Sequence, residues 1–219
     1  MTPKSHTRSK RFWDSKAESY AASAIADKKT YQRKLQETQS YLTPQMRVLE
    51  IGCGTGSTAL AHAPFVEHIQ ATDISSEMIG IAADKAEAAG IDNVTFTCGT
   101  LEDLTVEPAS FDAILALNIL HLLPNRMQAI EQAYQLLKPG GYFISSTACL
   151  GRTWFELLRA IVPVAKWLGK MPDLWFVSEA QLATEIYEAG FRIERQWHHG
   201  PQSLAVFIIA QKKQTSSPD

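Results

Sequence analysis

Apolar residues in this chain occur in short runs that alternate with amphipathic stretches of helical periodicity. Buried strands are predicted at five of these runs, residues 46–51, 68–72, 93–98, 111–117 and 142–148. Helices are predicted between them at 57–62, 75–89 and 125–137, with Ser75 or Ser76 as a cap and Gly90 as a stop. This alternation predicts a parallel sheet with helices on both of its faces.

The two ends of the chain depart from that alternation. The first 43 residues are polar and predict two short helices, Phe12–Ala24 and Lys28–Tyr41, before Pro44 ends the region. Near the other end, a helix at 178–189 is followed by strand-like runs at 191–197 and 203–211. Because no helix separates these two runs, they must pair antiparallel. We therefore predict a seven-stranded, mostly parallel α/β sheet that ends in a hairpin.

Composition narrows the class of protein without naming a function. The 219 residues suffice for one domain, and 45% of them are hydrophobic, which excludes a disordered or collagen-like chain. Lys and Arg number 21 against 23 Asp and Glu, so no nucleic-acid partner is expected. The N-terminal residues lack the apolar run of a signal peptide, and no uncharged run is long enough for a transmembrane segment.

The three cysteines are too scattered for a zinc site or a disulfide framework. We expect reduced thiols in a cytoplasmic protein, with no metal site. Cys53 is interpreted as a small filler in a loop, and Cys98 and Cys149 as buried strand residues.

The most informative stretch is VLEIGCGTG, residues 48–56, where a strand runs directly into glycines. Glycines allow a tight turn and close approach of a ligand to the backbone. Asp73 ends the next strand, 21 residues after Gly52, where a carboxylate can accept both hydroxyls of a ribose. A dinucleotide-binding domain shares this layout, so NAD(P)-dependent oxidoreduction remains an alternative.

Three features favour a different ligand. The glycine spacing is G-x-G-x-G, the sheet ends in a hairpin, and Glu50 would repel a pyrophosphate but suits an ammonium group. A ligand with a ribose, an amino group and no phosphate fits S-adenosylmethionine.

With these segments the sequence resembles the class I S-adenosylmethionine-dependent methyltransferases, of the small-molecule type that includes menaquinone and ubiquinone biosynthesis enzymes. The matching segments lie at 48–56, 71–79, 99–104, 111–123 and 136–144. The resemblance implies a Rossmann-like sheet of strand order 3-2-1-4-5-7-6 and S-adenosyl-L-methionine as the cofactor.

The resemblance also implies which residues bind the cofactor. Glu50, Gly52 and Gly54 would surround its methionine part, and Cys53 and Gly56 of the same loop are also expected to bind the cofactor. Asp73 would hold the ribose, Ile74 and Met78 would pack on the adenine, and Leu117 and Asn118 would border the methyl group.

One position departs from the family pattern. Thr100 stands where the family commonly has an Asp that accepts from the adenine amino group. The backbone N–H of Leu101 can still donate to the ring, and whether Glu102 replaces the missing carboxylate is left open.

Few residues are candidates for contact with the methyl acceptor. We consider His121, together with Asn118, as a catalytic base or orienting group, with a satisfied polar role as the alternative for His121. Tyr20 is predicted to contact the cofactor, with ordinary packing as its alternative, and Tyr31 is a weaker candidate. For His198 and His199, in the predicted hairpin turn, solvent exposure is the default.

Residues 152–173 form the most individual part of the chain, within a predicted lid insertion at 152–177. On a helical wheel their charged residues gather on one side and apolar and aromatic residues on the other, with Pro163 as a kink. They are interpreted as extra core, as a helical lid over a hydrophobic site, or as a weak membrane-surface contact. We divide the chain into N-terminal helices covering the cofactor site (1–44), a methyltransferase domain with this lid insertion (45–211) and a flexible tail (212–219).

These observations favour an enzyme that transfers a methyl group to a small, hydrophobic or amphipathic acceptor by in-line displacement. A non-catalytic S-adenosylmethionine-binding module is the alternative that the departure at Thr100 motivates. The sequence names neither the acceptor nor the oligomeric state.

Overall fold

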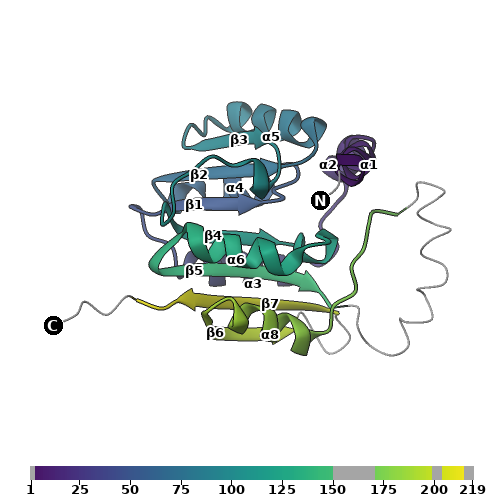
Figure 1. Cartoon of the computed structure of the whole chain (residues 1–219). Helices are drawn as coiled ribbons and strands as arrows, with labels where there is room; N and C mark the ends of the chain where they lie inside the picture. The colour runs from purple at the N-terminus through teal and green to yellow at the C-terminus, as the bar shows by residue number, and fades with distance from the viewer. Residues whose placement is uncertain (1–2, 150–170, 199–203, 215–219) are drawn as a thin grey trace.

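The structure, a computed structural model, describes residues 3–149, 171–198 and 204–214. Within these ranges seven strands form one sheet in the order β3-β2-β1-β4-β5-β7-β6, as predicted (Figure 1). The strands are β1 (Arg47–Ile51), β2 (His68–Asp73), β3 (Val94–Cys98), β4 (Phe111–Leu117), β5 (Leu137–Ala148), β6 (Phe191–His198) and β7 (Ala205–Lys212). Strands β1 to β5 are parallel, and β7 runs antiparallel to both β5 and β6, so the terminal hairpin is confirmed.

Helices cover both faces of this sheet. They are α1 (Pro3–Asp14), α2 (Ala17–Ala22), α3 (Lys28–Gln39), α4 (Ser57–His62), α5 (Ser76–Ala89), α6 (Arg126–Leu136) and α8 (Glu179–Glu188). Short 3-10 helices lie at η1 (Ala63–Phe65), η2 (Leu101–Asp103) and η3 (Leu120–Leu122). Helix α5 begins and ends as its sequence predicts, because Ser75 accepts from the N–H of Met78 and Gly90 adopts a left-handed conformation. None of the helices in the described ranges is long and apolar enough to cross a membrane.

The core is divided by the sheet into two clusters. Along β4, Ile114 and Ala116 belong to the cluster that includes residues of α6 and α8. The intervening Ala113 and Leu115 belong to the cluster that includes Ala59 of α4. Successive strand residues point to opposite faces, so each strand holds both layers of helices in place.

The N-terminal region differs from the single helix predicted at Phe12–Ala24. Two helices, α1 and α2, replace it, with the break at Ser15 and Lys16. The hydroxyl of Ser15 donates to the carbonyl oxygen of Phe12, and the N–H of Lys16 donates to that of Trp13, so the last turn of α1 tightens and ends.

Two further predictions about strands are corrected. Strand β5 begins at Leu137, not at Tyr142, because Pro139 is compatible with an extended chain and Gly140 supplies a positive φ of 79° beside an irregularity in the β4–β5 pairing. Cys98, predicted to be buried, is exposed because it ends the edge strand β3. Strand β7 also continues to Lys212, one residue into the predicted tail.

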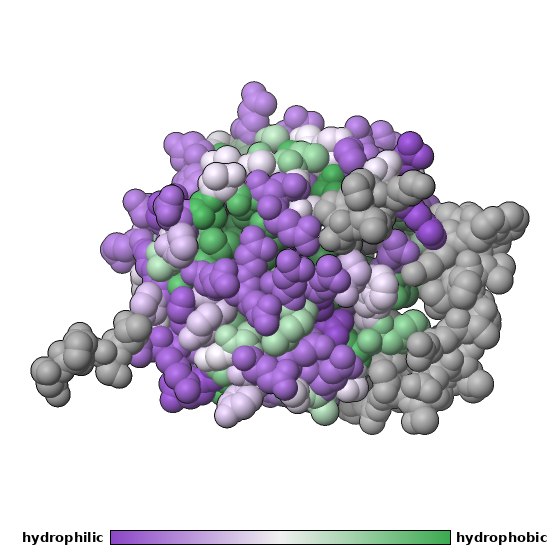
Figure 2. All heavy atoms as spheres, viewed as in Figure 1, coloured by the Kyte–Doolittle hydropathy of each residue, from purple (hydrophilic) through white to green (hydrophobic). Residues whose placement is uncertain are grey.

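The N-terminal helices lie beyond the carboxyl ends of the parallel strands. In Figure 1, α1 and α2 stand to the right of the arrowheads of β1 and β2, and both helices contact α5. Hydrophilic side chains cover most of the described surface in this view, and hydrophobic ones gather between α5 and α6 (Figure 2). The site is found at these carboxyl ends, below α1 and α2 in Figure 1.

Candidate functional site

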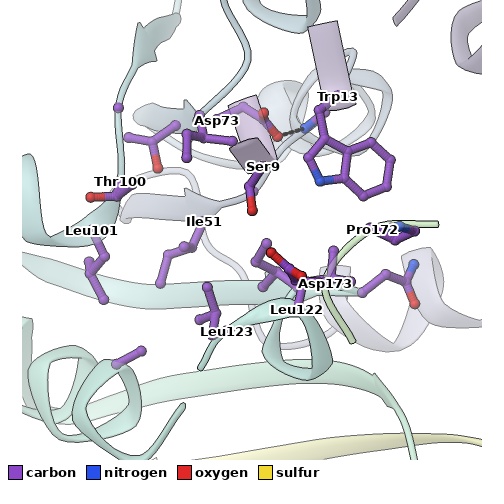
Figure 3. Close-up of a pocket in the computed structure, with 18 of the residues that line it drawn as sticks. Ser9, Trp13, Ile51, Asp73, Thr100, Leu101, Leu122, Leu123, Pro172 and Asp173 are labelled. Carbon is purple, nitrogen blue, oxygen red and sulfur yellow. Dashed lines mark hydrogen bonds between the residues drawn. The ribbon is translucent and has the colours of Figure 1, made fainter. Parts of the chain in front are cut away.

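A pocket lies at the carboxyl ends of β1, β2 and β4, where Ile51, Asp73 and Leu117 line it. Strand β1 pairs with β2 on one side and with β4 on the other, so this is the point where the strand order reverses. Figure 3 shows Asp73 and Trp13 on one side, with Leu122 and Leu123 across from them. The predicted site residues that line the pocket are Tyr20, Gly52, Gly54, Asp73, Ile74, Met78, Thr100, Leu101, Leu117 and Asn118.

The glycine loop after β1 requires glycine for two separate reasons. Gly52 and Gly56 both have positive φ angles, of 67° and 74°. A Cβ on Gly56 would lie 2.8 Å from the Cβ of Ala82, and one on Gly52 would lie 2.7 Å from a side-chain carbon of Ile119.

The loop is also held by Lys85, whose ammonium donates to the carbonyl and hydroxyl oxygens of Thr55. Gly56 caps α4 and does not line the pocket, so its role is to shape the loop.

Asp73 is fixed by the backbone around it. Its carboxylate accepts from the N–H of Gly54 and from the N–H of Ser75, both at 2.9 Å. Burial raises the pKa of Asp73, and these two hydrogen bonds act in the opposite sense. Each carboxylate oxygen retains a lone pair, and the side chain lines the pocket, so hydroxyl groups of a ligand can donate to it.

Glu50 does not line the pocket, although the next residue of β1, Ile51, does. The side chain of Glu50 is only 2% exposed, and within the described residues its Oε2 atom has no hydrogen-bond partner. Burial raises the pKa of Glu50 to about 8, and the nearby charge of Asp73 adds to the effect. A buried carboxyl group without a partner favours a cationic ligand group close by.

Cys53, the loop residue between Gly52 and Gly54, is buried and does not line the pocket. Burial is the main cause of the raised pKa of its thiol, and the charge of Glu50 raises it further. These properties agree with its interpretation as a filler and not as a nucleophile.

Thr100 and Leu101 form the end of the pocket next to β3 (Figure 3). Both the N–H and the hydroxyl of Thr100 donate to Asp103 at 2.8 Å, which starts η2. The carboxylate of Asp103 is therefore engaged in the turn, while Glu102 lines the pocket. The side chain of Gln132 also lines it and donates to the carbonyl oxygen of Leu101.

Aromatic side chains from the N-terminal helices cover the glycine loop. The ring of Tyr20 lies 3.7 Å from the position of a Cβ on Gly54, and its edge meets Trp13 at a centroid distance of 6.4 Å. Helix α1 is attached to the start of α5, because Asp14 accepts from the hydroxyl of Ser75 at 2.7 Å. This attachment holds the aromatic side chains over the loop.

The predictions missed several residues that line the pocket. Ser9 was missed because the helix that carries it was predicted to begin at Phe12, and Trp13 because nothing in its local sequence indicates that it reaches the pocket. Pro172 and Asp173 come from the described end of the predicted lid; its preceding part, residues 152–170, lies outside the described residues.

Two of the candidate histidines, His121 and His198, do not line the pocket. For His121, burial lowers the pKa of the imidazole, and the charge of Arg126 lowers it further. The carbonyl oxygen of His121 accepts from the N–H of Trp175. The catalytic role of His121 stays a prediction. His198 is half exposed and lies 3.1 Å from a carboxylate oxygen of Glu179, and His199 falls outside the described residues.

These features fit S-adenosylmethionine. Asp73 can accept from ribose hydroxyls, and Glu50, whose Oε2 atom has no hydrogen-bond partner among the described residues, suits a cationic amino group. Ile74, Met78 and Leu101 are apolar and line the same pocket, which suits the flat adenine ring. In the described part of the chain, no three His, Cys, Asp or Glu side chains gather as a metal site.

Comparison with known proteins agrees with this geometry. Residues 48–141 match a family model described as a methyltransferase domain. A ubiquinone biosynthesis O-methyltransferase from Xylella fastidiosa (strain 9a5c) is 34% identical over 154 residues, which cover 68% of this chain and 61% of the relative. The match therefore spans about three fifths of that relative's length.

Solved structures share the fold. The YcgJ protein of Bacillus subtilis superposes with a TM-score of 0.70 at 18% identity, covering 84% of this chain and all of that one. The 4+2 cyclase SpnF superposes with a TM-score of 0.69 at 20% identity, covering 84% of this chain and 82% of that one. At such identities the likeness shows the fold alone.

Proposed function

Because this chain belongs to the class I S-adenosylmethionine-dependent methyltransferase family, we propose that it transfers a methyl group to a small, hydrophobic or amphipathic acceptor. The observation that carries the proposal is the joint placement of Glu50 and Asp73. One is a buried carboxyl group whose Oε2 atom has no hydrogen-bond partner in the described part of the chain, and the other is a carboxylate that lines the pocket. Together they match the ammonium group and the ribose of the cofactor.

The residues of the pocket have distinct roles in this proposal. Asp73 holds the ribose, Glu50 attracts the amino group, and Glu102 supplies the carboxylate that Thr100 lacks at the adenine end. When bound, the cofactor supplies an electrophilic methyl group on sulfur. Tyr20 lies over the glycine loop and meets Trp13 edge-on, which helps to hold the cofactor in place for a direct displacement.

The acceptor binds, in this proposal, beside the methyl end of the cofactor near Asn118. The neighbouring Ile119, Leu122 and Leu123 are apolar and line the same pocket, which suits a hydrophobic molecule. The name of the Xylella relative adds support for a quinone-like acceptor that is methylated on oxygen.

Two measurements test the proposal. Isothermal titration calorimetry with S-adenosylmethionine should show binding, and NADH should show none. Methyl-labelled S-adenosylmethionine should then transfer label to at least one member of a panel of thiols, phenols, amines and quinols. Binding of NADH in preference to S-adenosylmethionine would overturn the cofactor assignment.

A second outcome distinguishes a non-methylating protein on the same fold. The structural neighbour SpnF is named as a cyclase, so the fold does not by itself require methyl transfer. If S-adenosylmethionine binds but no label is transferred to any acceptor class, a cofactor-binding module becomes the better description.

A further inference from the structure

A lysine without a carboxylate partner lies next to the pocket. Lys34, on α3, is half-buried, and its ammonium lies 3.4 Å from the hydroxyl oxygen of Ser146 near the end of β5. Across residues 3–149, 171–198 and 204–214, no carboxylate lies within ion-pair distance of Lys34. Burial lowers its pKa, and the charge of Asp27 offsets part of this effect.

Ser146 connects this lysine to the wall of the pocket. Its hydroxyl donates to Oδ1 of Asn118 at 3.3 Å, and its carbonyl oxygen accepts from the N–H of Asn118 at 2.7 Å. Asn118 has a positive φ of 60°, which costs energy for a residue with a side chain. These bonds hold Asn118 in that conformation, with the residue lining the pocket. One side chain therefore separates the Lys34 ammonium from a pocket residue.

The side of helix α3 that carries Lys34 also carries Tyr31. Tyr31 precedes Lys34 by three positions and so lies on the same side of the helix. Tyr31 is close enough to Tyr20 for its charge to act on the pKa of that phenol, and Tyr20 covers Gly54. The Lys34 side of α3 thus faces β5 and approaches Tyr20.

This environment selects for an anionic ligand atom. An ammonium group has three donors, and Ser146 takes one of them. A half-buried cation is stabilised by an opposite charge and would repel a protonated amine. We propose that Lys34 binds the ionised oxygen of the methyl acceptor, so that the site takes compounds with an acidic hydroxyl group such as phenols; this inference rests on the proposed function.

The chemistry balances without a further reactant. The hydroxyl proton passes to solvent when the acceptor ionises. The oxygen then uses an electron pair to form the bond to the methyl carbon, the carbon–sulfur bond breaks, and sulfur retains that pair. No oxidant is needed, and Lys34 keeps its proton throughout.

A spectroscopic titration tests the inference without turnover. The probe is 4-nitrophenol, whose ionised form is yellow, added to the protein saturated with S-adenosylhomocysteine. We expect the wild-type protein to bind the phenolate at least tenfold more tightly than the phenol, which appears as a lowered pKa of the bound probe. Lys34→Met should lose this preference, and Lys34→Arg should keep most of it.

Lys29→Met is the matched control, since Lys29 is an exposed lysine on the same helix. The inference is overturned if the wild-type protein shows no preference for the phenolate, if the probe does not bind, or if Lys34→Met behaves as Lys29→Met does. Label transfer from S-adenosylmethionine, measured separately on the broad acceptor panel, tests the proposed function. Transfer to amines or thiols with no phenolate preference would therefore refute this inference alone.

Discussion

Replacing Glu50 with glutamine tests the electrostatics of its buried carboxyl group. Burial raises the pKa of Glu50 in the folded protein from its ordinary value of 4.5 to about 8. The folded state therefore keeps a proton that the unfolded chain loses above pH 4.5. The stabilisation from this proton is complete below pH 4.5 and is lost as the pH rises to about 8.

The contribution of Glu50 to the free energy of unfolding can be measured separately within one pH range. His62 acts in the opposite sense, because burial lowers its pKa from 6.5 to about 4, and its stabilising effect is regained as the pH rises to 6.5. The two effects oppose each other below pH 6.5. Between pH 6.5 and 8 the Glu50 effect remains, and it amounts to about 1.5 kcal/mol of unfolding free energy.

Urea unfolding of the two proteins at pH 6.5, 7, 7.5 and 8 measures this difference. The wild-type protein should lose about 1.5 kcal/mol over this range relative to Glu50→Gln, since His62 is present in both. Glu67→Gln, at an exposed position, should leave the wild-type profile unchanged. Parallel profiles for the wild type and Glu50→Gln would refute the reasoning, because Glu50 would then titrate alike in the folded and unfolded states.

Three further substitutions have expected outcomes. Asp73→Ala should weaken S-adenosylmethionine binding by about 1.5–3 kcal/mol in calorimetry, through loss of a charge-assisted hydrogen bond. Gly56→Ala should lower the free energy of unfolding by about 1–3 kcal/mol, seen as a lower melting temperature. The added Cβ would lie 2.8 Å from the Cβ of Ala82, at a φ of 74°. Arg126→Met should destabilise by about 3 kcal/mol in urea, because it leaves the Glu185 carboxylate without its bidentate partner at 2.7 and 2.8 Å.

Each of these variants has a control. Asp84→Ala removes an exposed carboxylate from α5 and should leave cofactor affinity unchanged; an unchanged affinity in folded Asp73→Ala would contradict ribose binding. Gly80→Ala adds a Cβ with no neighbour within 4 Å and should not destabilise. Adding Glu185→Leu to Arg126→Met should recover stability; no recovery would mean that the loss is not electrostatic.

The sheet and the glycine loop could be predicted because their signals are local. The apolar run of β1, the glycines after it and the Ser75 cap of α5 each specify their own conformation over a few residues. The strand order was implied by the resemblance, and the terminal hairpin followed from the missing helix between β6 and β7.

The remaining features depend on contacts between distant parts of the chain. Helix α1 ends where Asp14 reaches Ser75, which lies 61 positions away, and no local pattern predicts that bond. Ser9 and Trp13 enter the pocket only because α1 docks there. The exposure of Cys98 follows from the position of β3 at the edge of the sheet.

The contact between α3 and β6 has a consequence for the order of assembly. The indole N–H of Trp197 donates to Glu37 at 3.0 Å, and the guanidinium of Arg33 stacks 3.8 Å above the same ring. These partners are separated by 160 positions or more. During synthesis α3 can therefore dock on the hairpin only after nearly the whole chain has been made. Until then, a nascent chain that already has its glycine loop lacks this anchor for α3, the helix that carries Lys34.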